Sequence, residues 1–384
     1  MMQTKERDVV IIGAGVNGLS IAYNLAKIDN KLKITVLEKN YVTSGGTGRC
    51  GGGIRSQFTT RETCKIAIKS MKIMEDLSKE LNTDIELRQG GYLILAHSDE
   101  ELEDFEKNVS LQNSLNIPSR ILDISEIKEI VPGIEINDVI GASFCNMDGV
   151  ANPFKVAFGY LDRAREMGVE VITHNEVKDV KLRNDKFLVK TEKNGYSSNW
   201  LVNAAGYESR KIAFLLNIDL PILPYEKEIF ATEPVDHFLD PMVMSFKKNF
   251  YISQTARREL VGGYSPEEQE PSDSIKSSFS FINHATGIMA QYLPQLKSLK
   301  IIRQWAGSYD ITPDALPILG PIEEAENFIQ ANGFSGHGFM LAPFVGRAIS
   351  SLIAGKNEYK HVLKNFSYER FKRGEFREER AVVG

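Results

Sequence analysis

The stretch VVIIGAGVNGLSIAYNL, residues 9–25, joins an apolar run to three closely spaced glycines and then to a run of small and apolar residues. Gly13 permits a tight turn after a strand, Gly15 lets a pyrophosphate approach the backbone, and Gly18 lets a helix pack closely on that strand. The free N–H groups at the start of such a helix favour an anion. This spacing predicts a strand, a turn and a helix that bind a dinucleotide.

A second apolar run, LKITVLEKN (residues 32–40), contains Glu38, 20 residues beyond Gly18. In a dinucleotide-binding fold, an acid at this position hydrogen-bonds the ribose 2′-hydroxyl and repels a 2′-phosphate. NAD or FAD is therefore favoured over NADP. The alternative is an ordinary βαβ unit without a ligand, and the order of strand, turn, helix, strand and acid argues against it.

The composition is that of an ordinary globular protein, because 42% of the 384 residues are hydrophobic and 25% are charged. A net charge of -5 provides no basic surface for nucleic acid. No apolar run approaches the ~18 residues of a membrane span, and the three cysteines match no zinc or disulfide framework. We therefore expect a cytoplasmic protein without a metal or a membrane span, and peripheral membrane association stays open.

Several segments indicate how the chain is organised. The stretch TSGGTGRCGGGIRSQF, residues 43–58, has six glycines and no apolar periodicity, so it predicts a loop. Alternating apolar residues between 222 and 264 predict an antiparallel sheet. The charged stretch RFKRGEFREER, residues 370–380, is expected to be a solvated tail.

Three helix starts are indicated by residues that suit the first turn of a helix. The expected pairs are Thr59 with Glu62, Ser98 with Glu101, and Asn152 with Pro153. Apolar residues at helical spacing from Cys64 to Leu81 support the first of these helices.

Glycine-rich segments recur far from the first fingerprint. VNAAG (residues 202–206) runs from an expected strand into small residues, and NGFSGHGFMLAP (residues 332–343) places three glycines at the start of an expected helix. An NAD site is usually complete within the first half of a chain, whereas these remote loops suit a longer cofactor. FAD is therefore favoured over NAD.

Together, the fingerprint with Glu38, the loop ending GIRSQF, VNAAG, WAGSYDITPDALPILG and GFSGHGF resemble the FAD-dependent amine oxidoreductases of the D-amino-acid oxidase and sarcosine oxidase type. The resemblance covers nearly the whole chain in order. The patterns RCG-G-IR-QF, FSGHGFM and RF-RGE-R are most similar to the β subunits of archaeal dye-linked L-proline dehydrogenases, and then to the β subunits of heterotetrameric sarcosine oxidases.

The resemblance implies an α/β fold in which a Rossmann-like FAD-binding lobe is interleaved with an antiparallel-sheet substrate lobe. We expect the FAD-binding domain in residues 1–85, 150–215 and 300–384. The substrate domain is expected in residues 86–149 and 216–299.

The implied activity is dehydrogenation of the C–N bond of a secondary-amine amino acid, L-proline or sarcosine, with electrons passed to a dye, a quinone or a partner flavin. The alternatives are an FAD-dependent dehydrogenase of D-amino acids, hydroxy acids or glycerol 3-phosphate, and an electron-transfer or assembly subunit that merely binds FAD. A hetero-oligomer and a homo-oligomer both stay open.

Four residues are expected to contact the substrate. Arg55 matches the arginine that binds the substrate carboxylate in similar sarcosine-oxidising enzymes, and its planar fork suits two-point binding; Arg49 is the alternative. His337, between two glycines, is expected at the active site, Tyr251 is expected on the substrate sheet, and Tyr309 occupies the position of a carboxylate-binding arginine in glycine oxidase relatives. No carboxylate base stands out, so we expect proximity, desolvation and carboxylate binding to promote the reaction.

Departures from the family pattern refine this picture. Tyr309 stands where glycine oxidase relatives carry an arginine, and Met340 replaces a lysine that is tied to oxygen reactivity, which favours a dehydrogenase. Gly307 and Pro153 stand where relatives attach a flavin, so noncovalent FAD is expected, and a second flavin, FMN, at a subunit interface stays open. The expected FAD-binding residues are Gly13, Gly15, Val16, Gly18, Glu38, Lys39, Thr47, Arg49, Cys50, Gly53, Val177, Ala205, Gly206, Gly307, Gly333, Ser335, Gly336, His337, Gly338, Phe339 and Met340.

Overall fold

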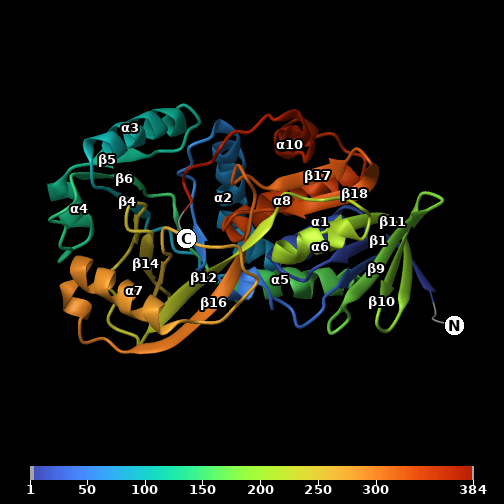
Figure 1. The fold of residues 1–384 in the computed structure, drawn as a ribbon, viewed down its shortest axis with the longest axis horizontal. Helices are drawn as coiled ribbons and strands as arrows, with labels where there is room; N and C mark the ends of the chain where they lie inside the picture. The colour runs from blue at the N-terminus through green and yellow to red at the C-terminus, as the bar shows by residue number, and fades with distance from the viewer. Residues whose placement is uncertain (1–3, 383–384) are drawn as a thin grey trace.

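The computed structural model describes residues 4–382 and contains two large sheets (Figure 1). The strand that precedes the N-terminal glycines lies inside the first of these sheets. The main path of this sheet follows the order β17 (Ile318–Ile322), β18 (Ala325–Asn332), β11 (Gly195–Asn203), β1 (Thr4–Ile12), β2 (Ile34–Leu37) and β8 (Glu170–Ile172). β10 (Lys186–Thr191) pairs with β11 and with β9 (Val177–Arg183). The strands from β18 to β8 are parallel, so their carboxyl ends share one edge.

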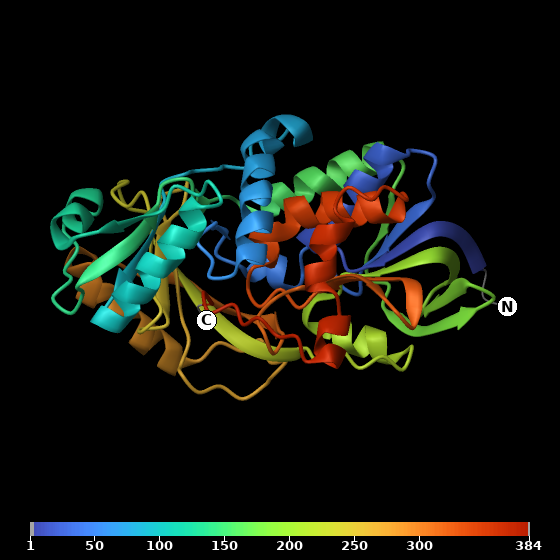
Figure 2. The ribbon, with the colours of Figure 1, turned by 90° about the horizontal axis from the view of Figure 1, so that it is seen from above.

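Helices cover the first sheet, and glycines let them approach closely. α1 (Val16–Ile28) packs against α5 (Pro153–Glu166) and α8 (Gly338–Ile353). A Cβ atom at Gly18 would lie 2.1 Å from the carbonyl oxygen of Gly13, and one at Gly346 would lie 2.0 Å from the hydroxyl of Ser20. Neither position has room for a side chain, so the helix contacts require glycine. α2 (Arg61–Leu81) crosses the same region between the two lobes (Figure 2).

The second sheet has the order β16 (Ile301–Ile311), β12 (Leu223–Thr232), β15 (Leu260–Tyr264), β14 (Phe250–Gln254), β13 (Met242–Ser245), β4 (Tyr92–Ala96), β6 (Gly141–Cys145) and β5 (Arg120–Leu122). Every neighbouring pair is antiparallel except β13 with β4, which is parallel. The prediction of an antiparallel sheet between residues 222 and 264 is confirmed, with β13 joining it through a parallel pair.

The two faces of the second sheet have different neighbours because side chains alternate along a strand. On β4, Leu93 and Leu95 join the core under α4 (Ile124–Ile130) and α7 (Phe279–Tyr292). Tyr92 and Ile94 face the other way and pack in a cluster with residues of α3 (Asp99–Asn113). The same alternation directs Met242 and Met244 of β13 to the face that carries Tyr92.

The two longest strands of the second sheet, β12 and β16, extend toward the first sheet (Figure 1). Their pairing runs from Leu223 opposite Ile311 to Thr232 opposite Ile301. β16 therefore belongs to the second sheet by its hydrogen bonds, although the sequence analysis placed residues 300–384 in the FAD-binding domain. The domain boundary expected at residue 300 lies directly before β16, so it assigns a strand of the second sheet to the FAD-binding domain.

The remaining elements are short. They are the pair β3 (Gly53–Ile54) with β7 (Gly149–Val150), the 3₁₀ turns η1 (Gly46–Arg49), η2 (Gly206–Glu208), η3 (Pro294–Leu296) and η4 (Lys364–Phe366), and the helices α6 (Ser209–Phe214), α9 (Lys360–Leu363) and α10 (Glu369–Arg373). Between residues 4 and 382, no helix combines the length and the apolar character needed to cross a membrane.

Two of the three expected helix starts are confirmed, and the third is displaced. Ser98 accepts a hydrogen bond from the Glu101 N–H, and Asn152 caps the helix that begins at Pro153. α2 is capped by Thr60 and not by Thr59, because the helix begins at Arg61 and the Thr60 hydroxyl accepts from the Thr63 N–H.

The prediction that residues 370–380 form a solvated tail is wrong for two of these residues. Arg370 and Glu379 are 3% and 2% exposed, since both form several hydrogen bonds inside the protein. The C-terminal segment is therefore packed into the fold at these points.

Candidate active site

A cavity of about 400 Å³ opens at the carboxyl ends of β1, β2 and β11 and continues to β16 and the start of α8. Ligands of open α/β sheets bind at this edge. It brings together most of the residues expected to bind FAD. The expected residues that line it are Gly13, Gly15, Val16, Glu38, Lys39, Thr47, Arg49, Cys50, Val177, Ala205, Gly206, Gly336, Gly338 and Phe339.

The first turn of this cavity is a cradle without side chains. Gly13 has a φ of 108°, a conformation that favours glycine, and a Cβ atom at Gly15 would lie 3.2 Å from the hydroxyl oxygen of Thr47. α1 begins directly after Gly15, and the Val16 N–H donates to Thr47 at 3.0 Å. A phosphate can therefore reach the start of the helix, where the backbone dipoles favour negative charge.

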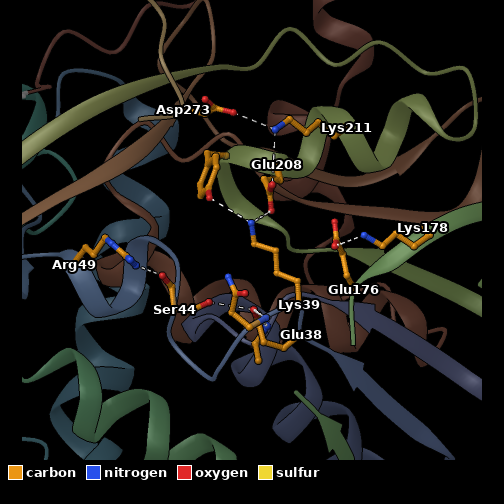
Figure 3. Close-up of polar contacts among 12 residues, drawn as sticks. Glu38, Lys39, Ser44, Arg49, Glu176, Lys178, Glu208, Lys211 and Asp273 are labelled. Atoms are coloured by element: carbon orange, nitrogen blue, oxygen red, sulfur yellow. Dashed lines mark hydrogen bonds and ion pairs between the residues drawn. The ribbon is translucent and has the colours of Figure 1, made fainter. Parts of the chain in front are cut away.

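Glu38 lies at the end of β2 and is 7% exposed. Its carboxylate accepts hydrogen bonds from the N–H groups of Ala14 and Asn40, both at 2.9 Å, and from the hydroxyl of Ser44 at 3.1 Å (Figure 3). These bonds fix the turn after β1 to the turn after β2. Glu38 thus organises the cavity wall and presents an acceptor at the position that suits a ribose hydroxyl.

A chain of charges crosses the cavity from Lys39, as Figure 3 shows. The Lys39 ammonium lies 2.5 Å from Glu208, and Lys211 lies 3.8 Å from Glu208 and 3.2 Å from Asp273. Ile275, close to Asp273 in the chain, lines the same cavity. Lys39 was expected from the sequence, whereas Glu208, Lys211, Asp273 and Ile275 were not, because they lie outside the recognised nucleotide-binding motifs.

A second cavity, of about 70 Å³, adjoins the first, and Cys50, Tyr309, Gly336 and Phe339 line both. It brings together all four residues expected to contact the substrate: Arg55, Tyr251, Tyr309 and His337. The expected FAD-binding residues Gly53, Ser335 and Met340 also line it. Residues that the sequence analysis missed complete the wall: Gly51, Gly52, Tyr92, Met242 and Met244.

Arg55 is the cation of the smaller cavity and is 3% exposed. Its Nη2 lies 3.2 Å from Nε2 of His337 and donates to the carbonyl of Ala381, while Nη1 has only the Met244 sulfur, at 3.9 Å. Within residues 4–382, Nε has no partner and no carboxylate forms an ion pair with the guanidinium. Burial lowers the pKa of Arg55, yet a guanidinium keeps its charge at neutral pH. The site therefore holds a buried positive charge with donors free for an anion.

His337 is neutral in this environment. Burial and the adjacent Arg55 charge lower its pKa to about 3. Because a guanidinium only donates, Nε2 of His337 accepts from Arg55 and Nδ1 carries the proton. The ring also meets Phe58 edge-on, with centroids 4.9 Å apart. His337 is thus held as a neutral acceptor beside the positive charge.

Three tyrosines border the smaller cavity, and each packs where a glycine leaves room. A Cβ atom at Gly263 would lie 2.5 Å from the Tyr251 ring, one at Gly336 would lie 2.4 Å from the Tyr309 ring, and one at Gly53 would lie 1.9 Å from the Tyr92 hydroxyl. Burial raises the pKa of Tyr309 to about 12 and also raises the pKa values of Tyr92 and Tyr251 above the usual value of a phenol. All three phenols stay protonated at neutral pH and can donate to a ligand.

Two buried carboxyl groups hold the loops of the site, and the sequence analysis missed both. Asp148 accepts from the N–H of Ser56 at 2.7 Å and from the Gln57 amide at 3.1 Å, so it fixes the residues directly after Arg55. Asp310 accepts from the Gly333 N–H at 2.7 Å, in the turn before α8. Burial raises the pKa of each to about 6. A single acid in a turn or strand carries no sequence signal for this role.

Three glycines expected to bind FAD line neither cavity. Gly18 packs against Gly13, and a Cβ atom at Gly307 would lie 2.9 Å from Cβ of Arg49. Gly333 has a φ of 68°, and its Cβ position lies 2.6 Å from Thr312. The close contacts that require glycine at these three positions are contacts with other protein atoms. These glycines therefore support the cavity walls without lining a cavity.

A family model described as FAD dependent oxidoreductase matches residues 8–352. The chain belongs to this family. As an FAD-dependent oxidoreductase it is an enzyme, and the resemblance drawn from its motifs is confirmed. The glycine cradle and the position of Glu38 fit FAD, whose nucleotide end Gly13, Gly15 and Glu38 would hold, and the larger cavity continues from there to the start of α8.

Relatives cover nearly the full length of this FAD-dependent oxidoreductase. Sarcosine oxidase subunit beta of an Arthrobacter species is 30% identical over 99% of this chain and 94% of the relative. The protein of the same name from Rhodobacter capsulatus is 29% identical over 99% of this chain and 92% of the relative.

Among solved structures, L-proline dehydrogenase from P. horikoshii is similar with a TM-score of 0.91 and 35% identity, covering 97% of this chain and all of that one. Glycine oxidase from Geobacillus kaustophilus has a TM-score of 0.86 at 23% identity, covers 92% of this chain and 96% of that one, and supports the fold alone. The predicted α/β fold with a Rossmann-like lobe and an interleaved second lobe is confirmed.

Proposed function

We propose that this enzyme dehydrogenates the C–N bond of a secondary-amine amino acid, with L-proline as the first candidate and sarcosine as the second. The observation that carries the proposal is Arg55, a buried guanidinium with free donors and, in the described part of the chain, no carboxylate of its own. Such a group binds a carboxylate through its positive charge and its free N–H donors. The similarity to L-proline dehydrogenase and to the sarcosine oxidase β subunits supports this substrate class.

The other walls of the smaller cavity suit a small, weakly polar substrate body. Met242, Met244 and Met340 supply flexible apolar side chains, and the tyrosines supply neutral hydroxyl groups. No Asp or Glu is among the lining residues in the described part of the chain. An ammonium group would therefore lie near Arg55 without a counter-charge, which favours its loss of a proton.

In the proposed reaction a hydride leaves the carbon beside the nitrogen, a proton leaves the nitrogen, and a C=N double bond forms. FAD, when bound, supplies the acceptor for the hydride. The chain's own residues do the rest. Arg55 orients the carboxylate, and the tyrosines and methionines exclude water. Because His337 is neutral, it adds no second positive charge beside the amine.

The rival substrates are less well matched by this cavity. Glycerol 3-phosphate carries a dianion, and Arg55 is the single Lys or Arg among the lining residues that the structure describes. Lys227, one of the few cations in the substrate region, is 9% exposed, bonds to Gln269 and lines neither cavity. A D-amino acid or a hydroxy acid could use Arg55 equally well, so substrates must be compared directly.

Several finer points belong to the same proposal. Electrons pass to a dye, a quinone or a partner flavin, because Met340 at the smaller cavity carries no charge to promote reaction with oxygen. FAD is noncovalent, since a reactive side chain at position 307 would collide with Arg49. We place the FAD-binding domain on the first sheet and the substrate domain on the second, with β16 in the latter. A cytoplasmic location stays a prediction.

A partner subunit, with FMN at the interface, is also proposed. The sarcosine oxidase relatives are named as β subunits. On this chain, α5 begins at Pro153 and carries Phe154 and Phe158 one turn apart. These two phenylalanines are 47% and 42% exposed. Phe154 also contacts the region of η1, since a Cβ atom at Gly48 would lie 3.3 Å from its ring. An apolar surface this close to the cofactor cavity suits a protein partner.

The test is anaerobic mixing of the FAD-loaded protein with L-proline, D-proline, sarcosine, glycine, L-lactate and glycerol 3-phosphate, followed by flavin absorbance. Fastest bleaching by L-proline or sarcosine is expected. Faster bleaching by glycerol 3-phosphate or L-lactate would contradict the proposal, and no bleaching by any substrate would favour an assembly subunit. Reoxidation of the bleached flavin by a redox dye and by air then separates a dehydrogenase from an oxidase.

A further inference from the structure

The C-terminal segment after α10 returns to the active site. In both views it leaves α10 and runs toward the space between the lobes (Figures 1 and 2). Its start is fixed by Arg370, which donates to both carboxylate oxygens of Asp314 at 2.7 and 2.9 Å. Further along, the Glu379 N–H donates to the carbonyl of Asp314 at 2.9 Å. The segment is therefore tied to the loop after β16 before it reaches Arg55.

Glu379 is the main anchor of this segment. It is 2% exposed, and its carboxylate accepts from the N–H groups of Thr59 and Thr60 at 2.9 and 3.1 Å and from their hydroxyls at 2.7 and 3.0 Å. It also accepts from the N–H of Ala381 at 3.1 Å. A buried carboxylate with five donors is held in one position. The loop that carries Arg55 ends at these two threonines, so Glu379 joins the tail to that loop.

The hydrogen bond that the Ala381 N–H donates to the Glu379 carboxylate turns the tail back toward the active site. Ala381 is 4% exposed, and its carbonyl accepts from Nη2 of Arg55. The same Nη2 donates to His337, so both of its hydrogens are engaged. Among residues 4–382, Nη1 has no oxygen or nitrogen partner and Nε has no partner, so these donors stay available for a ligand. By engaging Nη2, the tail and His337 determine which donors of the guanidinium a ligand can reach.

We propose that Glu379 is a positioning residue of this active site. By holding Ala381 against Arg55, it directs the free donors of the guanidinium toward the substrate carboxylate and keeps the Arg55–His337 bond in place. The inference rests on the proposed function, because it takes Arg55 as the residue that binds the carboxylate. A purely structural role, as a cap of α2, would stabilise the fold without affecting ligand binding.

The test compares Glu379→Gln, Arg55→Lys and the double variant in the full-length, FAD-loaded protein. The probe is tetrahydro-2-furoate, a ring carboxylate with no oxidisable C–N bond, whose Kd is measured from the change in flavin absorbance. Glu379→Gln is expected to raise this Kd roughly 10-fold or more, as for a lost hydrogen bond to a charged group, with a smaller change in the limiting rate of flavin reduction by L-proline. The double variant should bind no more weakly than Arg55→Lys, because Glu379 acts through Arg55.

The matched control is Glu369→Gln, which alters another buried carboxylate of the C-terminal region. Glu369 is 6% exposed and accepts from the Glu323 N–H at 3.0 Å, away from the cavity residues. This variant should lower Tm and leave the Kd unchanged. If Glu379→Gln does not fold, Ala381→Pro removes the N–H from which Glu379 accepts and keeps the Glu379 carboxylate with its bonds to Thr59 and Thr60, and a rise in Kd is expected again.

The two proposals fail in distinguishable ways. A wild-type Kd in Glu379→Gln, or in Ala381→Pro, overturns the positioning role alone. Effects of Glu379→Gln and Arg55→Lys that add in the double variant also overturn it, since they would show independent action. A wild-type Kd in Arg55→Lys overturns the proposed carboxylate-binding site, and the positioning role with it.

Discussion

Replacing Arg55 with lysine separates charge from geometry at the centre of the site. Lysine keeps the positive charge but loses the planar fork and the second donor edge. In the structure Arg55 is 3% exposed and, among residues 4–382, its Nη1 has only the Met244 sulfur as a partner, so a substrate carboxylate would be bound there in a buried environment. Breaking a buried, hydrogen-bonded charge pair costs about 2 to 5 kcal/mol. This range corresponds to a loss of about 30- to 5,000-fold in kcat/KM for flavin reduction.

The assay is anaerobic stopped-flow reduction of bound FAD by L-proline and by sarcosine. FAD content and Tm are measured in parallel, because Arg55 also contacts Ala381 and His337 and its loss can disturb the fold. Arg49→Lys is the matched control. Arg49 lines the larger cavity and donates to the carbonyls of Ser44 and Gly45, so its replacement should weaken FAD binding and spare the KM. A wild-type kcat/KM in Arg55→Lys with full FAD content would refute the reasoning.

Three further outcomes follow from the geometry. Acid precipitation should release intact FAD into the supernatant because Gly307 offers no attachment point, and yellow colour in the pellet would contradict this. Glu38→Ala should raise the Kd for FAD about 10- to 150-fold and lower Tm, since it removes an acceptor from ribose and leaves the Ala14 and Asn40 N–H groups unpaired; fluorescence titration with FAD measures the first effect. The pKa of His337 is lowered to about 3, so its imidazole stays neutral as pH rises through the usual histidine range. His337 should therefore contribute no step to the pH profile of the limiting rate of flavin reduction between about pH 5 and 8, and a step that disappears in His337→Gln would show that His337 titrates there.

The nucleotide end of the site could be predicted from sequence because its determinants are local. Gly13, Gly15 and Glu38 lie within one strand–helix–strand unit, and each answers a requirement of the backbone or of the ribose. The GFSGHGF turn was predictable for the same reason, since closely spaced glycines allow a backbone that other residues resist. These features need no knowledge of how distant segments meet.

The substrate end depended on pairing between distant segments. Tyr92 faces the cavity because β4 pairs with β13 and β6, and no periodicity within GYLILA reveals which face is turned inward. Ala381 contributes only a carbonyl group, which any residue possesses. Asp148 carries no sequence signal and Glu379 lies in the charged stretch expected to be solvated, so only their buried partners reveal their roles. The charged tail was misjudged because composition records charge and not its hydrogen-bond partners.

The parallel pairing of β1 with β11 has a consequence for synthesis of the protein. β1 leaves the ribosome first, yet its partner strand β11 is Gly195–Asn203, and β11 in turn pairs with β18 (Ala325–Asn332). The central strands of the first sheet can therefore assemble only after most of the chain has been translated. Contacts this distant in sequence slow folding and prolong the exposure of apolar strands. The cavity for FAD is complete only when these strands have paired, and a bound cofactor stabilises the folded state, so cofactor supply should affect the yield of folded enzyme at its last step.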